Sequence, residues 1–492
     1  MRQLLFIAVL LSCASLFGTE KPNIVFVLTD DLGVNDIGAF NPDTFYETPR
    51  INRLATEGMR FTSAYTACNV CSPTRYSIQT GKYPVRSGVT NFLAGTRSEK
   101  FEPAKLDRFM PLEEKTLGEA FHEGGYRTAY FGKWHLGDIN QYGPDKQGFD
   151  VVSGDMRFLA PEYKNKIKFA DNPPLQRNDP RIETRTTQIT EDALVTLDAF
   201  QTMEKKPFLL FLAFYQVHVP LGSSEKYTEP YRKKKVELGL QDDAAKDFAD
   251  EEQVQMTDEP RKTRIRQNHV VYAGMMSHTD ECVGRILDKL DVLGLRENTI
   301  VVFMSDNGGL ATAEGSPTSN LPFRAGKGWN YEGGLRAPLI VRYPKSVMPG
   351  TVCDVPVIST DFYPTLLDMT GTPEQPQQHI DGISFAPLLR GEAKDLPPRN
   401  LFWHYPHYSN QGGFPSSAIR SGDYKLIQRL EDGRAHLFNV KEDLGERNDL
   451  AAKMPEKAAE LQKLLFDWYK ETDARFLEPK DGQMPWHPAG TK

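Results

Sequence analysis

The sequence predicts an α/β fold with a large, mostly parallel central sheet flanked by helices, followed by a smaller C-terminal subdomain. Two observations predict it. Short apolar runs alternate with amphipathic helical patterns over most of the chain, as expected for strand–helix–strand units. From about residue 401 the pattern changes to short alternating strands around turns, followed by a helix. We therefore expect a signal peptide at 1–19, a main domain at 20–398 and an antiparallel-sheet subdomain at 399–492.

Length and composition allow a large folded core and argue against one class of partner. The chain has 492 residues, of which 39% are hydrophobic and 25% charged, as in ordinary globular proteins. The net charge of −7 argues against a generalised nucleic-acid surface. Any anionic ligand must therefore be captured by a local cluster of cations.

The first residues read as an export signal. Arg2 provides a positive start, Leu4–Leu11 an apolar stretch, and small residues follow. We predict removal of this segment and release into the periplasm or the medium. Cys13 ends a loose lipobox, so lipid anchoring is the alternative to release; no later stretch is apolar for long enough to predict a transmembrane anchor.

Four apolar runs predict buried strands of the main sheet. The first is Ile24–Leu28, and the others lie within 126–137, 207–221 and 298–309. Each is short, rich in residues that favour strands, and followed by polar residues. Ligands of parallel α/β sheets bind beyond the carboxyl ends of the strands, which is where these polar residues fall.

Helical patterns and a charged region separate these strands. The clearest helix is predicted at His269–Leu293, where apolar residues recur at spacings of three and four. Ser223–Arg266 carries dense charge of both signs and is predicted to be a solvated helical excursion. In the C-terminal part, strands are predicted around turns at Ser421-Gly422 and Asp432-Gly433, and a helix at Pro455–Tyr469.

Two pairs of oxygen-bearing side chains follow predicted strands. Asp30-Asp31 ends the first, and Asp306-Asn307 ends the last. Adjacent carboxylates repel each other unless a cation neutralises them, and an all-oxygen set selects calcium or magnesium. Helix caps or turns would explain either pair alone, but the presence of two pairs favours a metal site.

The stretch "CSPTRYSIQTG", residues 71–81, places Cys71 two residues before a proline and four before Arg75. Cys68 and Cys71 form a C-x-x-C pair. Three roles compete for Cys71: it could form a disulfide, bind a metal such as zinc, or be the precursor of a more reactive group. The chain has five cysteines, too few and too scattered for a disulfide framework, and no second pair accompanies this one. We favour the reactive group.

Cations and histidines follow the same strands. Lys133 and His135 stand in "GKWHLG", His218 in "YQVHVP", and Lys327 in "AGKGWNYEGG". A lone lysine is usually solvated and a lone histidine usually structural. Together with Arg75 and a divalent cation, however, they are what a tetrahedral oxyanion such as sulfate or phosphate requires.

These motifs resemble those of the formylglycine-dependent sulfatases, the type I or arylsulfatase-like family. The signature Cys-x-Pro-Ser/Thr-Arg followed by Thr-Gly is matched at 71–81, and "LTDDLG", "GKWHLG", "SDNGG", "YEGGLRAP" and "AIRSGDYKLI" stand in the family's order. The resemblance covers essentially the whole mature chain. It implies an alkaline-phosphatase/sulfatase-like fold and, in an exported protein, a bacterial carbohydrate sulfatase.

The resemblance also implies how the site would be formed. Cys71 would be oxidised to formylglycine by a formylglycine-generating or anaerobic sulfatase-maturating enzyme. Calcium, in preference to magnesium, would be held by Asp30, Asp31, Asp306, Asn307 and the converted Cys71.

The resemblance further implies roles for the cations and histidines. Arg75 would help hold the attacking hydroxyl of the hydrated aldehyde, and His218 would protonate the leaving oxygen. His135 would deprotonate the second hydroxyl so that sulfate is expelled. Lys133 and Lys327 would bind the sulfuryl oxygens, with Ser153 as a further contact.

The substrate expected from the resemblance is a sulfated saccharide derived from a polysaccharide. Aromatic and histidine residues gather in Leu401–Gly413, and we hypothesise that His404, His407 and Tyr408 approach the glycan. Packing between domains is the alternative for this stretch. Arg324 is a second candidate for the sugar subsite.

Two rival functions remain open at this stage. One is a broad arylsulfatase or a related phosphate or phosphonate monoester hydrolase. The phosphatases of that group usually bind two metals with more histidine ligands, whereas this chain has only ten histidines, none of them clustered. The other is a non-catalytic sulfated-glycan binder in which Cys71 stays unmodified.

Overall fold

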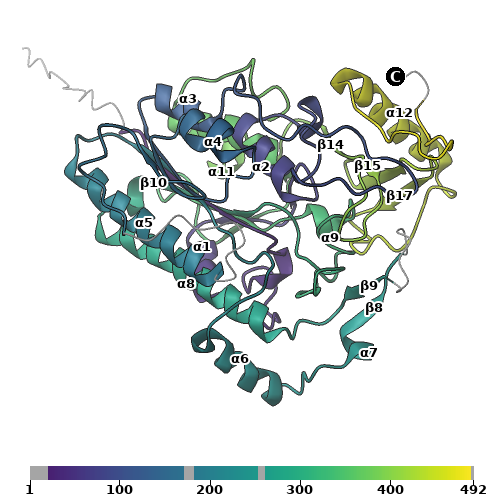
Figure 1. Cartoon of the computed structure of the whole chain (residues 1–492), viewed down its shortest axis with the longest axis horizontal. Helices are drawn as coiled ribbons and strands as arrows, with labels where there is room; N and C mark the ends of the chain where they lie inside the picture. The colour runs from purple at the N-terminus through teal and green to yellow at the C-terminus, as the bar shows by residue number, and fades with distance from the viewer. Residues whose placement is uncertain (1–19, 171–181, 253–260, 489–492) are drawn as a thin grey trace, which may run out of the picture.

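The computed structural model describes residues 20–170, 182–252 and 261–488 (Figure 1). The predicted signal peptide at 1–19, including Cys13, lies outside the described residues. In the described part of the chain, no helix combines the length and the apolar character needed to cross a membrane.

A nine-stranded sheet forms the centre of the molecule, and it is mostly parallel as predicted. Its spatial order is β12-β2-β11-β10-β1-β7-β4-β5-β6, and the five strands from β10 to β5 all run parallel. β11 and β6 run antiparallel to their neighbours β10 and β5. The strands are β1 Asn23–Thr29, β2 Met59–Phe61, β4 Arg127–Gly132, β5 Val151–Gly154, β6 Phe158–Leu159, β7 Phe208–Ala213, β10 Thr299–Ser305, β11 Leu339–Arg342 and β12 Thr351–Cys353.

Both faces of the sheet are covered by helices, which explains why the central strands are apolar throughout. Along β1, Val25 and Val27 join the core on one side, whereas Phe26 and Leu28 join the core on the other. Helices α1, α5 and α8 pack on the first face, and α2, α3, α10 and α11 on the second (Figure 1). Their bounds are α1 Pro49–Glu57, α2 Cys71–Thr80, α3 Leu117–Glu123, α5 Ile182–Thr202, α8 Val270–Val292, α10 Phe362–Thr370 and α11 Ala386–Leu389.

The long predicted helix is α8, and its start agrees with the prediction to one residue. His269 is the N-cap, and its ring Nδ1 accepts a hydrogen bond from the backbone N–H of Tyr272. The charged region before it contains α6 Glu225–Glu237 and α7 Ala244–Asp247, as expected for a helical excursion. It also contains a short hairpin that the charge pattern concealed, with β8 Phe248–Asp250 paired to β9 Lys262–Arg264.

The C-terminal part forms the predicted antiparallel sheet with a helix packed against it (Figure 1). Its order is β14-β15-β16-β17, and the hairpins at Ser421-Gly422 and Asp432-Gly433 connect neighbouring strands. The elements are β14 Asn400–Tyr405, β15 Ser416–Ser421, β16 Tyr424–Arg429, β17 Ala435–Asn439 and α12 Pro455–Thr472. The remaining short elements are β3 Ala64–Tyr65 and β13 Val357–Ile358, which pair with each other, α4 Ile139–Tyr142 and α9 Glu332–Leu335.

The carboxyl ends of four adjacent strands bring the predicted polar residues to one edge of the sheet. β1 leads to Asp30, β4 to Lys133, β7 to the loop with His218, and β10 to Asp306. At the end of β4, Gly132 has a φ of 110°, and a Cβ there would lie 1.9 Å from the Ala213 carbonyl oxygen. Only glycine allows this close approach, and it directs the next residue, Lys133, across the end of β7.

Candidate active site

Cys71 is the first residue of α2, and its side chain lies beneath the carboxyl edge of the sheet. The preceding residue, Val70, is extended, and every residue of α2 is buried. The Cys71 sulfur lies 3.2 Å from Nδ1 of His135. Burial raises the pKa of this thiol, although Lys133 and Lys327 act in the opposite direction. The first turn of α2 presents its positive end at this position.

Arg75 lies one turn further along α2, so it projects on the same side as Cys71. Its guanidinium donates to Asp306 from Nη2 at 2.7 Å and from Nε at 3.0 Å. It also reaches Asp30, at 3.4 Å, and the backbone oxygen of Lys133, at 2.7 Å. This fully buried arginine therefore joins the ends of β1, β4 and β10.

Two lysines neutralise the Asp30-Asp31 pair. Lys133 Nζ lies 2.5 Å from Asp30, and Lys327 Nζ lies 2.7 Å from Asp31. Burial alone would raise the pKa of Asp30, but Lys133, His218 and Arg75 outweigh it and hold that pKa well below its usual range. Asp31 has a φ of 63°, a left-handed conformation that turns the second carboxylate toward Lys327.

The oxygen atoms expected to hold a cation lie together, and two of them lack donors. Within the described residues, Asp30 Oδ1 and Asn307 Oδ1 are buried and have no hydrogen-bond partner. Asn307 Nδ2 donates to Asp31 Oδ1 at 2.9 Å, and the Asp31 backbone N–H donates to Asp306 Oδ1 at 3.3 Å. Burial and the charge of Asp30 raise the pKa of Asp306. The cluster has the donor chemistry of a hard divalent cation site.

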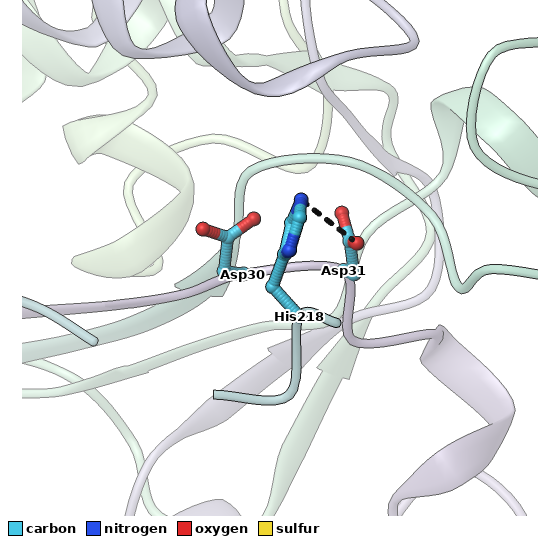
Figure 2. A group of neighbouring side chains, drawn as sticks. All are labelled: Asp30, Asp31 and His218. Atoms are coloured by element: carbon cyan, nitrogen blue, oxygen red, sulfur yellow. Dashed lines mark ion pairs between the residues drawn. The ribbon is translucent and has the colours of Figure 1, made fainter. Parts of the chain in front are cut away.

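His218 faces the two aspartates of this cluster. Figure 2 shows its ring between Asp30 and Asp31, and one potential ligand atom from each of the three lies within 4.8 Å of the others. Nε2 is 3.7 Å from Asp31 Oδ2, and Nδ1 is 2.5 Å from the Val219 carbonyl oxygen. Burial and Lys327 lower the pKa of His218, whereas Asp31 and Asp30 oppose the shift.

These side chains open onto one cavity of about 640 Å³. Its wall includes Asp30, Cys71, Lys133, His135, His218 and Lys327. The structure therefore brings together the predicted nucleophile position, both lysines and both histidines, next to the oxygen cluster. Such a site can bind a tetrahedral anion against several positive groups while an adjacent nucleophile attacks it.

Two predicted substrate contacts lie elsewhere because they have other partners. Ser153, on β5, is buried and donates to Asp192. Arg324 pairs with Glu251 at 2.6 Å and stacks on Tyr331. Neither lines the cavity.

The three residues predicted to approach the glycan, His404, His407 and Tyr408, do not line the cavity either. His404 is bonded through its ring to Ser417 and to the backbone oxygen of Arg475, and it packs against α12. His407 bonds to Thr90, and Tyr408 donates to Glu431. All three are buried in packing between segments, the alternative that the sequence left open.

Several residues of the cavity wall were not predicted. The stretch Leu401–Gly413 does reach the cavity, but through Asn410 and Gln411. Arg185, on α5, and Tyr215 also line it. The position of Tyr215, two residues after the end of β7, was a usable signal, whereas nothing in the local sequence distinguishes Arg185.

The fold and this site define a hydrolase of esters of tetrahedral oxyanions. The chain belongs to the sulfatase family: the family model described as Sulfatase matches residues 22–372. A second model, described as N-sulphoglucosamine sulphohydrolase, C-terminal, matches residues 325–472. The protein is therefore a sulfuric ester hydrolase.

Similar proteins are found among both sequences and solved structures. A sulfatase of Formosa agariphila is 30% identical, covering 89% of this chain and 85% of the relative. The N-acetylgalactosamine-6-sulfatase of Mus musculus is 32% identical, covering 86% and 75%. The crystal structure of Ps i-CgsB in complex with k-i-k-neocarrahexaose is 26% identical and covers 91% of this chain and 93% of that one, with a TM-score of 0.71.

Proposed function

We propose that this sulfatase removes sulfate from a sulfated saccharide released from a polysaccharide, using a formylglycine formed from Cys71 and a bound calcium ion. A relative named N-acetylgalactosamine-6-sulfatase and a similar structure in complex with k-i-k-neocarrahexaose support a saccharide substrate. The observation that carries the proposal is the position of Cys71. It lies at the start of α2, on the wall of a cavity shared with five positive or histidine side chains and with Asp30 of the oxygen cluster.

The residues of the cavity and the oxygen cluster fit both a bound calcium ion and a formylglycine at position 71. Asp30, Asp31, Asp306 and Asn307 would hold calcium together with the converted residue 71, and two of their buried oxygens have no hydrogen-bond donor in the described chain. A hydrated aldehyde at position 71 would supply the nucleophilic oxygen, and calcium would polarise the sulfate ester.

The two lysines are suited to bind the sulfuryl oxygens. Each ammonium has three donors, so the contact of Lys133 with Asp30, or of Lys327 with Asp31, leaves others for a ligand. Both lysines line the cavity. They would stabilise negative charge that develops on sulfate during transfer.

The two histidines are placed for opposite proton transfers. His135 lies beside residue 71, where it can accept a proton from an oxygen at that position. At His218 the Val219 carbonyl fixes a proton on Nδ1, so Nε2 carries a proton only in the imidazolium form. Asp31 stabilises that form, which can then protonate the leaving saccharide oxygen.

Maturation and export complete the proposal. A formylglycine-generating or anaerobic sulfatase-maturating enzyme would act on Cys71, with Pro73 and Arg75 of the signature intact. The predicted signal at 1–19 would direct the protein to the periplasm or the medium.

A matched pair of cysteine variants tests this function in a host that carries the maturation enzyme. Sulfate release is measured from a panel of defined sulfated mono- and oligosaccharides and from their phosphorylated counterparts. Wild type and Cys68→Ala should release sulfate, whereas Cys71→Ala should fall to background, because Cys68 is buried in the same segment but does not line the cavity. Faster release of phosphate than of sulfate, or equal activity of Cys71→Ala, would contradict the proposal.

A further inference from the structure

Arg185 is a buried guanidinium on the wall of the active-site cavity. It lies in the first turn of α5 and is only 3% exposed. The same cavity is lined by Cys71, Lys133 and His218. Arg185 therefore borders the space in which a saccharide would extend from the sulfate group.

Two of the three guanidinium nitrogens of Arg185 are not engaged by the described part of the protein. Within residues 20–170, 182–252 and 261–488, its Nε and Nη2 are buried without a hydrogen-bond partner. Buried arginine is rare unless it is paired, because leaving a buried charged donor unsatisfied is costly. An anionic ligand in the cavity would supply the missing acceptors, and a guanidinium binds carboxylate or sulfate oxygens through two parallel hydrogen bonds.

Neighbouring contacts hold Arg185 in place. Its guanidinium carbon lies 4.8 Å from the ring centre of Tyr215, in the geometry of a cation–π contact. The Tyr215 hydroxyl donates to one Asp155 oxygen at 2.5 Å, and the backbone N–H of Trp134 donates to the other at 3.2 Å. Neither of these unpartnered nitrogens is bonded to Asp155, and no ion pair to Arg185 is present in the described chain.

The same contacts join Arg185 to the loops that carry the reaction. Trp134 stands between Lys133 and His135, and the His218 backbone N–H donates to the Tyr215 backbone oxygen at 3.1 Å. The guanidinium is thus fixed relative to the groups that bind sulfate and protonate the leaving oxygen.

We infer that Arg185 forms a subsite for a second anionic group of the saccharide, either the carboxylate of a uronic acid or another sulfate, beside the ester that is cleaved. This inference rests on the proposed function and narrows its substrate class to saccharides with at least two anionic groups close together. Arg185 is here a specificity residue, since it contacts the substrate away from the reacting atoms.

Calorimetric binding to the full-length, calcium-loaded Cys71→Ala protein tests the inference without turnover. One ligand pair is a hexosamine 6-sulfate with and without a second sulfate. The other is a disaccharide of that hexosamine with a uronic acid, compared with its carboxyl-reduced form. With Arg185 intact, the doubly anionic member of at least one pair should bind roughly 30-fold more tightly, as expected for a buried charge-assisted pair.

Substitution of Arg185 should remove this preference. We expect the ratio within the pair to fall to about 3-fold or less in Arg185→Gln and to an intermediate value in Arg185→Lys, which keeps the charge but lacks the planar fork. Arg285→Gln is the matched control, because Arg285 pairs with Glu191 on the exposed side of α5. It should keep the full ratio.

The possible outcomes separate the inference from the proposed function. The pair that shows the preference identifies the second anion as sulfate or carboxylate. Equal binding of both members of both pairs, no binding of any ligand, or an unchanged ratio in a folded Arg185→Gln protein would overturn the subsite. If the ratio behaves as expected but the wild-type enzyme releases no sulfate from these ligands, the proposed function fails while the subsite stands.

Discussion

Asn307 and Asp30 are the residues that bear most directly on whether the site holds a cation. Each leaves one buried oxygen without a donor among the described residues, and such an unsatisfied group destabilises a fold by about 1–3 kcal/mol. A divalent cation would satisfy both oxygens at once. The proposed metal site therefore explains a feature that the protein atoms alone leave unexplained.

Replacing Asn307 with alanine should weaken calcium binding and, with it, sulfate release. Loss of an outer-shell partner typically lowers metal affinity about 10- to 100-fold, so loss of a direct ligand should lower it at least as much. Calorimetric titration of the metal-free protein with calcium would measure the change. Asn448→Ala, an exposed change in the C-terminal part, is the control; equal calcium affinity in the two variants would contradict the assigned ligand.

Among individual residues, the sequence predicted those site residues that directly follow strands of the parallel sheet. Asp30, Lys133, His218 and Asp306 each follow a strand, so their convergence follows from parallel pairing. Whether Ser153 and His404 contact the substrate could not be predicted in the same way, because the partner of a side chain depends on how the surrounding segments pack. Arg185 was missed because its role depends on where the first turn of α5 lies relative to β7.

The C-terminal sheet shows how an element can be predicted while the role of its side chains is not. Its turns and alternation predicted β15, β16 and β17. The histidines of the 401–413 stretch suggested ligand contact, but β14 is an edge strand of that sheet and buries His404 against α12. The charged hairpin of β8 and β9 was missed because three-residue strands carry too little alternation to be recognised.

Two buried neutral histidines, on β14 and just after it, should make the free energy of unfolding sensitive to acid. Burial lowers the pKa of His404 to about 4 and of His407 to about 3, compared with about 6.5 in an unfolded chain. The unfolded chain then binds protons that the folded one does not. The stabilisation is therefore complete above pH 6.5 and is lost as the pH falls toward 4, by about 1.4 kcal/mol per pH unit for each histidine.

Chemical denaturation at pH 7.5 and pH 5.5 would measure this loss. We expect the drop in unfolding free energy between the two conditions to be smaller in the His404→Gln, His407→Gln double variant than in wild type, by about 3 kcal/mol. If the double variant showed the same drop in unfolding free energy as wild type, these histidines would not be buried in the neutral form.

At the scale of the whole molecule, a buried charge cluster joins the C-terminal sheet to α9. Lys425, on β16, lies 2.9 Å from Glu332 and 3.0 Å from Glu446, and all three are fully buried. Glu332 is the first residue of α9, five positions after Lys327, and its backbone N–H donates to Glu446 at 2.6 Å. The C-terminal sheet therefore supports the segment that carries Lys327, a lysine proposed to bind sulfate.

Lys425→Met should destabilise the protein strongly, because it leaves two buried carboxylates without their shared cation. Removing one partner of a buried ion pair typically costs about 3–5 kcal/mol. Lys441→Met is the matched control, since Lys441 is exposed and pairs loosely with Asp423 at 3.6 Å. Thermal denaturation should separate the two variants clearly, and similar midpoints would show that the cluster contributes little.

The chemical state of residue 71 is the single quantity on which the proposed chemistry depends, and mass spectrometry of one tryptic peptide measures it. The peptide 61–75 should be isolated from enzyme that releases sulfate, purified from its native host. We predict that it carries the mass deficit of an aldehyde at position 71 while Cys68 remains a thiol. A free thiol at Cys71 in sulfate-releasing enzyme would contradict the account, since the described residues that line the cavity include no serine, threonine or other cysteine to take its place.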